Sequence, residues 1–120
     1  MRCEDDEGES VIISDEQVEQ ALDFLRESAK RAAVARSQAK TMEKYLSVVE
    51  AKAKMLATQE GMSNVAAADW ARSSEDYRTA LDAWAEAIRQ DAEFTMLREA
   101  ASSRILAWQT FSANERSARV

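Results

Sequence analysis

The sequence contains no histidine, no proline, only two glycines and a single cysteine, Cys3. Without histidine there is no Cys/His zinc site and no histidine-dependent catalytic arrangement, and one cysteine cannot form an intramolecular disulfide. The serines and threonines lack a base that would activate them as nucleophiles. We therefore expect no enzymatic activity and no cofactor.

The carboxylates do not suggest a metal site either. The pairs Glu75/Asp76 and Asp91/Glu93 lie at a predicted helix start or on a polar helix face. A helical carboxylate site needs ligands that converge from separate elements, and no Glu-x-x-His pair is possible in this chain. The sequence predicts no metal ligand.

Length and composition indicate one helical domain. A chain of 120 residues has room for one domain, and its 46% hydrophobic content comes largely from alanine rather than from the β-branched and aromatic residues that favour sheets. No apolar run approaches the roughly 18 residues of a membrane span. The first residues are acidic, unlike the basic start of a signal peptide. We expect a cytoplasmic protein.

The chain divides into an acidic tail and a helical region. Residues 1–12 hold five carboxylates and are predicted to be disordered, because they cannot offset their own ordering entropy. Residues 13–118 are predicted to form a single domain. Capping signals, the glycine at position 61 and helical periodicity predict three helices, over about residues 14–59, 64–72 and 75–115.

Both long helices carry an apolar stripe. On the first, steps of three and four residues continue almost without fault, with two successive three-residue steps around Ala35. Its members are Val18, Leu22, Leu25, Ala29, Ala32, Ala35, Ala39, Met42, Leu46, Val49, Ala53 and Leu56. On the last helix they are Tyr77, Leu81, Trp84, Ile88, Ala92, Phe94, Leu97, Ala101, Ile105, Trp108 and Phe111. These stripes predict an all-α fold, a long antiparallel coiled-coil-like helical hairpin with a short connecting helix. Because a lone hairpin leaves apolar surface in water, we also expect a homo-oligomer.

Charge is distributed unevenly along this acidic chain. Residues 1–25 carry a net charge of −8 and residues 55–120 one of −3, whereas residues 26–54 carry +5 and contain every lysine. The acidic tail is either a solubilising arm or a segment that competes with nucleic acid for the basic region. A basic region on one long helix is the place where a polyanion would bind.

At 100° per residue, Arg36, Lys40 and Lys44 form a row on the side of the helix away from the apolar stripe. The predicted nucleic-acid-binding residues are Arg36, Lys40, Lys44, Lys52 and Lys54. Such a row can follow a phosphate backbone, and an oligomer would repeat it. The alternative is a solvated helix face that binds nothing.

Aromatic side chains that could stack on bases are mostly assigned to the core. Trp84 and Trp108 fall on the apolar stripe of the last helix, as do Tyr77, Phe94 and Phe111. Tyr45 and Trp70 are the exceptions, since Tyr45 adjoins Lys44 and Trp70 lies in the short helix.

Three features carry a resemblance to a known family. They are the basic segment YLSVVEAKAK at residues 45–54, the break at Gly61, and the segment ARSSEDY at residues 71–77, which leads into a second long helix with Trp84. Over residues 35–115 this layout resembles the UvsY-type recombination mediators of bacteriophages.

The resemblance implies a protein that binds single-stranded DNA, assembles as a ring of helical hairpins, and helps to load a RecA-like recombinase onto strands covered by single-strand-binding protein. It implies that Lys40, Lys44, Lys52 and Lys54 belong to the basic helix of that family. The acidic overall charge departs from the family pattern and predicts binding that weakens strongly with salt.

Two hypotheses on function follow from the sequence. The first is an accessory protein of phage recombination or repair that binds single-stranded DNA through its basic helix face. The second is a non-enzymatic coiled-coil adaptor, assembly chaperone or inhibitor that acts by binding another protein.

Overall fold

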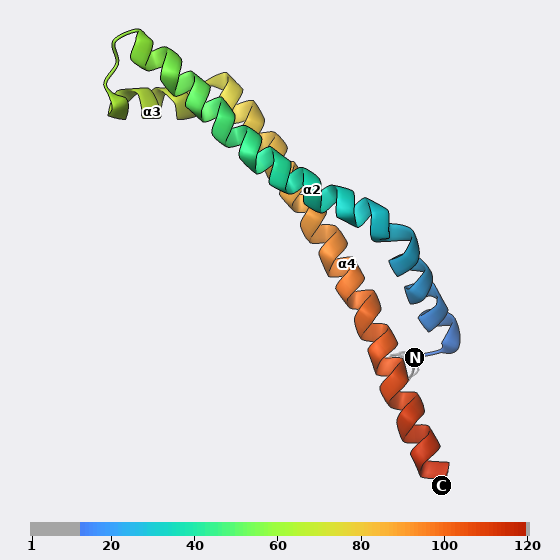
Figure 1. The fold of residues 1–120 in the computed structure, drawn as a ribbon. Helices are drawn as coiled ribbons and strands as arrows, with labels where there is room; N and C mark the ends of the chain where they lie inside the picture. The colour runs from blue at the N-terminus through green and yellow to red at the C-terminus, as the bar shows by residue number, and fades with distance from the viewer. Residues whose placement is uncertain (1–12, 120) are drawn as a thin grey trace, which may run out of the picture. The chain divides into compact units, whose positions relative to one another are not determined.

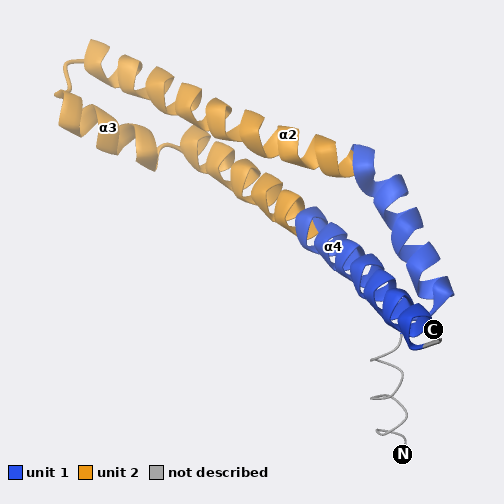
Figure 2. Ribbon diagram, turned by 60° about the horizontal axis from the view of Figure 1, so that its bottom comes forward, with its two compact units in different colours: residues 1–30, 94–120 blue, residues 31–93 orange. Residues whose placement is uncertain are grey.

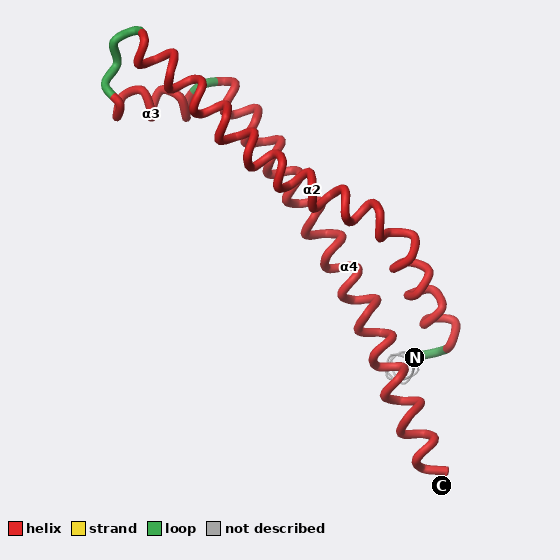
Figure 3. The backbone as a smooth tube through the Cα atoms, in the orientation of Figure 1, coloured by secondary structure: helices red, strands yellow, loops and turns green. Residues whose placement is uncertain are grey.

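The computed structural model describes residues 13–119, which form three helices and no strand: α2 (Asp15–Gln59), α3 (Asn64–Ser73) and α4 (Glu75–Arg119) (Figures 1 and 3). The all-α prediction is confirmed. The predicted acidic tail, residues 1–12, lies outside the described residues. The predicted end of the last helix near residue 115 is wrong, because α4 continues to Arg119. The helix continues because Asn114, the residue next to the predicted end, is only mildly unfavourable in a helix, and neither glycine nor proline follows it.

Serine side chains cap the start of each helix. At α2 the cap is a capping box: Gln17 N donates to Ser14 Oγ at 3.2 Å, and Ser14 N donates to Gln17 Oε1 at 3.0 Å. At α3 the cap is Ser63, whose hydroxyl accepts from Ala66 N. Ser74 caps α4 by accepting from the amide of the residue three positions on. Each cap satisfies an amide that has no partner within its helix.

α2 ends just before Gly61, whose positive φ of +97° is not a helical conformation. L-residues rarely adopt such a φ, whereas glycine adopts it without a steric cost. The amide of Met62 donates to Ala57 O and that of Gly61 donates to Thr58 O, at 3.1 and 3.0 Å. This pair of hydrogen bonds is the Schellman arrangement, which satisfies carbonyls at a helix end. The chain then reverses into α3.

The described residues fall into two compact units (Figure 2). Unit 1 contains residues 13–30 and 94–119, the first part of α2 and the last part of α4. Unit 2 contains residues 31–93, the rest of the two long helices and α3.

Polar contacts show that the two helix segments of unit 1 are antiparallel. Trp108 Nε1 donates to Asp15 Oδ1 at 2.9 Å, near the start of α2. Ten residues back along α4, Arg98 Nη1 donates to the carbonyl of Leu25 and to Ser28 Oγ, both at 2.7 Å. As the residue number falls on α4 it rises on α2, so the segments run in opposite directions.

The helices of unit 2 form an antiparallel hairpin in the same way. Arg36 Nε lies 3.6 Å from Asp91 Oδ1, and further along α2 Glu50 Oε2 accepts from Arg72 Nε at 2.8 Å. The side chains buried between the helices are small. Among the described residues, nine of the ten buried apolar side chains are alanines, the exception being Val18 in unit 1. Small side chains let helix backbones approach closely, so little apolar side-chain volume is enclosed.

On α2 the predicted apolar stripe is correct at most positions and wrong at three. Leu22, Ala29 and Leu56 are exposed, and the buried residues are instead Ala21, Ser28 and Ala57. With Ala21 in place of Leu22 and Ser28 in place of Ala29, steps of three and four alternate from Val18 to Ala53, so the predicted irregularity around Ala35 disappears. At positions 21 and 57 the close approach of the helices favours the smaller neighbour over leucine, whereas Ser28 is buried with a hydrogen-bond donor from α4, Arg98.

On α4 the predicted stripe fails at five positions, all exposed: Leu81, Ile88, Ala92, Leu97 and Phe111. Ala80, Ala87 and Ala101 are buried, and Tyr77, Trp84, Phe94, Ile105 and Trp108 are half-buried. Large apolar side chains therefore lie along the flanks of the helix contact. None of the described helices contains an apolar stretch long enough to cross a bilayer.

Candidate nucleic-acid interface

Three predicted binding residues lie exposed on one side of α2, and we call Lys40, Lys44 and Lys54 the basic face. At 100° per residue all three fall within about 80° of one another, and Lys40 and Lys44 lie about 100° and 140° around the helix from buried Ala39, whereas Lys54 lies about 60° from it. Lys40 and Lys44 are one turn apart, or about 6 Å along the helix axis. The ion pairs found among residues 13–118 do not include these lysines.

Arg36 differs from these lysines because it contacts an acid on the neighbouring helix. Its Nε lies 3.6 Å from Asp91 Oδ1, although its side chain remains 61% exposed. The predicted row of Arg36, Lys40 and Lys44 is thus continuous in position, but its first charge is partly balanced. Arg36 links α2 to α4 besides adding charge to the surface.

Several acids of unit 2 are engaged by arginines. Arg89 binds Glu86 at 2.8 Å and Glu93 at 3.3 Å, all on α4. Hydrogen bonds from Arg89 lower the pKa of the Glu86 carboxyl to about 2, and the same contacts raise the pKa of Arg89. The hydrogen bond with Glu50 likewise raises the pKa of Arg72. In the described part of unit 2, the acids of these ion pairs are bound by arginines and not by the lysines of the basic face.

A groove with a volume of about 530 Å³ lies between α2, α3 and α4 of unit 2. Tyr45 of α2 and Trp70 of α3 both line it, and their side chains are 52% and 43% exposed. The other lining residues are Val48, Val49, Lys52, Ala53, Leu56, Ser74, Asp76, Thr79, Ala80 and Ala83. The groove thus has a mostly apolar lining with two exposed rings.

Lys52 lines this groove and is turned about 120° from Lys40 around the helix. The structure therefore separates the predicted binding residues into a basic face and a groove lysine. Asp76, in the first turn of α4, also lines the groove. From the sequence, Asp76 was expected at a helix start and was considered and rejected as a metal ligand, and Leu56 was expected in the apolar stripe.

Aromatic side chains follow the predicted division with one correction. Trp84 and Trp108 are half-buried along the helix contacts, as are Tyr77 and Phe94. Tyr45 and Trp70 are exposed, as expected for the two exceptions. Phe111 was assigned to the core but is 41% exposed, because Trp108 and Ser112 occupy the side of α4 that meets α2.

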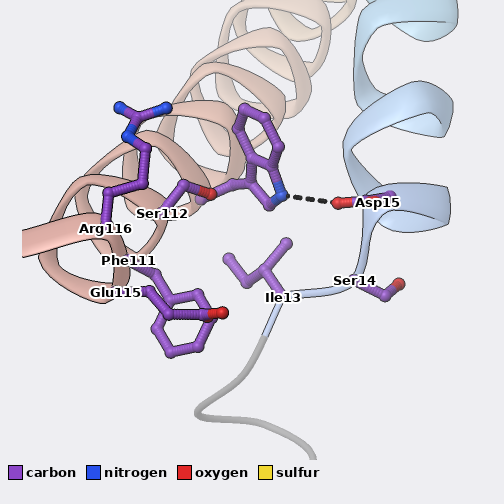
Figure 4. Close-up of a pocket in the computed structure, with 8 residues that line it drawn as sticks. Ile13, Ser14, Asp15, Phe111, Ser112, Glu115 and Arg116 are labelled. Atoms are coloured by element: carbon purple, nitrogen blue, oxygen red, sulfur yellow. Dashed lines mark hydrogen bonds between the residues drawn. The ribbon is translucent and has the colours of Figure 1, made fainter. Parts of the chain in front are cut away.

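A second cavity, of about 460 Å³, lies in unit 1 at the start of α2. Figure 4 shows Ile13 and Phe111 on different segments facing the same space, with the Trp108–Asp15 hydrogen bond at one side. That hydrogen bond satisfies the indole N–H. We interpret this cavity as a structural feature of unit 1, formed where side chains pack at the end of the helix pair.

The described residues contain no group of three or more cysteine, aspartate or glutamate side chains that could hold a metal ion. Comparison with protein-family models, with curated proteins and with solved structures finds no match to this chain.

Proposed function

We propose that this protein is an accessory single-stranded-DNA-binding protein that contacts phosphates through its basic face, Lys40, Lys44 and Lys54. The observation that carries this proposal is the exposure of these lysines on one side of α2, outside the ion pairs of the described residues. An ammonium group that already faces solvent can neutralise a phosphate without first breaking an internal salt bridge. Arg36 extends the row but must share its charge with Asp91.

The biological setting of the proposal comes from the resemblance of residues 35–115 to UvsY-type mediators. In that setting the protein helps to load a RecA-like recombinase onto strands covered by single-strand-binding protein, and a homo-oligomer repeats the basic face. These partners are proposed from the resemblance alone.

The test is fluorescence anisotropy of a labelled oligothymidylate titrated with the full chain over a salt series. The variant Lys40→Glu/Lys44→Glu should weaken binding strongly at low salt. For single strands, log K changes with log salt by about −0.7 per phosphate neutralised, so loss of two contacts should reduce the slope by about 1.4.

The matched control is Arg78→Glu/Arg104→Glu, which changes the net charge equally at exposed positions of α4. It should retain most of the wild-type affinity. If Lys40→Glu/Lys44→Glu bound as well as the wild type, or if both double variants lost affinity equally, the basic face would not be the binding site. Far-UV circular dichroism should show unchanged helicity in both.

A second candidate function is that of a helical adaptor that binds another protein. Large exposed apolar side chains on both long helices favour it, among them Met55, Leu81, Ile88 and Leu97. Where such side chains adjoin one another in a contiguous apolar patch, the patch marks a protein-binding surface. Absence of DNA binding at low salt, together with a protein partner recovered by pull-down, would support the adaptor.

A further inference from the structure

We infer that the groove of unit 2 is a base-stacking subsite, in which Tyr45 and Trp70 hold unpaired bases of single-stranded DNA. The phosphates of that strand follow lysines of α2, Lys44 and Lys52. The inference rests on the proposed function and deepens it, since it explains how a single strand is distinguished from a duplex. In a duplex the bases already stack on one another, whereas a single strand can place them on protein rings.

The first ground is that two exposed rings from different helices line one groove. Tyr45 and Trp70 are separated by 25 positions in sequence, yet α2 and α3 bring them to the same surface. Half-buried Trp84, by contrast, packs along the helix contact. Nearly half of the Trp70 side chain is open to solvent, so the packing of α3 leaves a ring surface available.

The second ground is the chemistry of the groove wall. Val49, Ala53 and Ala80 line the groove with apolar side chains, and Ala80 is buried. Such a wall accepts a flat, weakly polar surface such as the face of a nucleobase. It does not solvate a phosphate.

The third ground is the position of charge around the rings. Lys52 of α2 lines the groove itself, and Lys44 directly precedes Tyr45 in the sequence of the same helix. Asp76 places a negative charge on the α4 side. Phosphates are therefore attracted to the α2 side and repelled from the α4 side, which leaves the groove to the bases.

The experiment compares two oligonucleotides of equal length and charge, an oligothymidylate and an abasic strand of the same number of phosphates. The full-length protein should bind the oligothymidylate at least tenfold more tightly. At the same time Trp70 fluorescence should be quenched, identified as the difference between wild type and Trp70→Phe.

Tyr45→Ala and Trp70→Ala should each weaken oligothymidylate binding by about five- to 150-fold, the effect of one lost stacking contact. The salt slope should not change, because no phosphate contact is lost. Tyr45→Phe and Trp70→Phe keep a ring and should restore most of the affinity. Phe111→Ala removes an exposed ring in unit 1 and serves as the matched control, with wild-type affinity expected.

The outcomes separate the inference from the proposed function. If the abasic strand bound as tightly as the oligothymidylate, the stacking inference would be wrong and phosphate binding would stand. If neither strand bound at low salt, the proposed function would be wrong as well. If light scattering showed that Tyr45→Ala or Trp70→Ala lowers the molecular mass, the groove would be an interface between copies of this chain, which also overturns the inference.

Discussion

Arg98 of α4 donates a hydrogen bond from Nη1 to Ser28 Oγ of α2 at 2.7 Å, and the same nitrogen donates to the Leu25 carbonyl at 2.7 Å. Ser28 is fully buried, the only buried polar side chain among the described residues. The guanidinium is thus held at one place on α2 by two acceptors. Buried polar contacts of this kind fix the register of a helix pair, because a shift would leave the polar groups without partners.

We expect Ser28→Ala to lower the free energy of unfolding by about 1–3 kcal/mol, although alanine is the better helix former. The reason is that the Arg98 guanidinium loses one of its two acceptors in a half-buried site. Urea unfolding followed by circular dichroism, at several protein concentrations, measures the effect.

The control is a double-mutant cycle with Arg98→Met, which removes the charge and keeps an apolar stem. In the background of Arg98→Met, Ser28→Ala should be close to neutral, since the hydroxyl has lost its cross-helix donor. Equal effects of Ser28→Ala in both backgrounds would contradict the interpretation that this hydrogen bond fixes the register.

The fold was largely predictable because its signals are local. The Ser14 capping box, the caps before α3 and α4, and Gly61 each depend on residues within a few positions, and all lie where sequence analysis placed the helix ends. The burial pattern was harder to predict. Ala29 is more apolar than Ser28, yet Ser28 is buried, because Arg98, 70 positions away, supplies its partner.

The candidate site could be predicted only in part for the same reason. Helical geometry alone predicts that Lys40 and Lys44 share a side of α2. It does not predict that Asp91 contacts Arg36, or that Trp70 meets Tyr45 in one groove, because both depend on how separate helices pack. The sequence signals that pointed to the groove were Tyr45, next to Lys44, and Trp70 in the short helix, the two aromatic residues not assigned to the core.

Close helix contact through alanine leads to a second prediction, on α4 of unit 2. Ala87 is buried against the neighbouring helix, whereas Ala85, two positions earlier, is exposed. Ala87→Leu should destabilise the chain by about 1–3 kcal/mol, because the added side chain forces the helices apart. Ala85→Leu adds the same volume on the exposed side and should change the stability by less than about 0.5 kcal/mol.

Thermal unfolding of the two leucine variants, run side by side, checks this prediction. Helix propensity cancels in the comparison, since both substitutions are alanine to leucine within the same helix. If Ala85→Leu proved as destabilising as Ala87→Leu, the outer side of α4 would itself be packed against something, such as a second copy of the chain.

The third prediction concerns the acid limb of stability and the contact between Glu86 and Arg89. Two hydrogen bonds from Arg89, at 2.8 and 3.0 Å, and one from Gln90, at 3.1 Å, hold the pKa of Glu86 at about 2, below its ordinary value of 4.5. The carboxylate therefore binds its proton more weakly in the folded than in the unfolded chain. The resulting stabilisation is complete above about pH 4.5 and is lost as the pH falls towards 2.

Carboxyl ¹³C NMR should place the titration midpoint of Glu86 near pH 2, and Arg89→Gln should move it towards 4.5. In thermal unfolding, Glu86→Gln should remove this part of the pH dependence between 4.5 and 2 and leave that of the other carboxylates. The difference between the two proteins should shrink in high salt, because both side chains are more than half exposed and their attraction is screened. Identical pH profiles for wild type and Glu86→Gln at low salt would show that the contact does not form in solution.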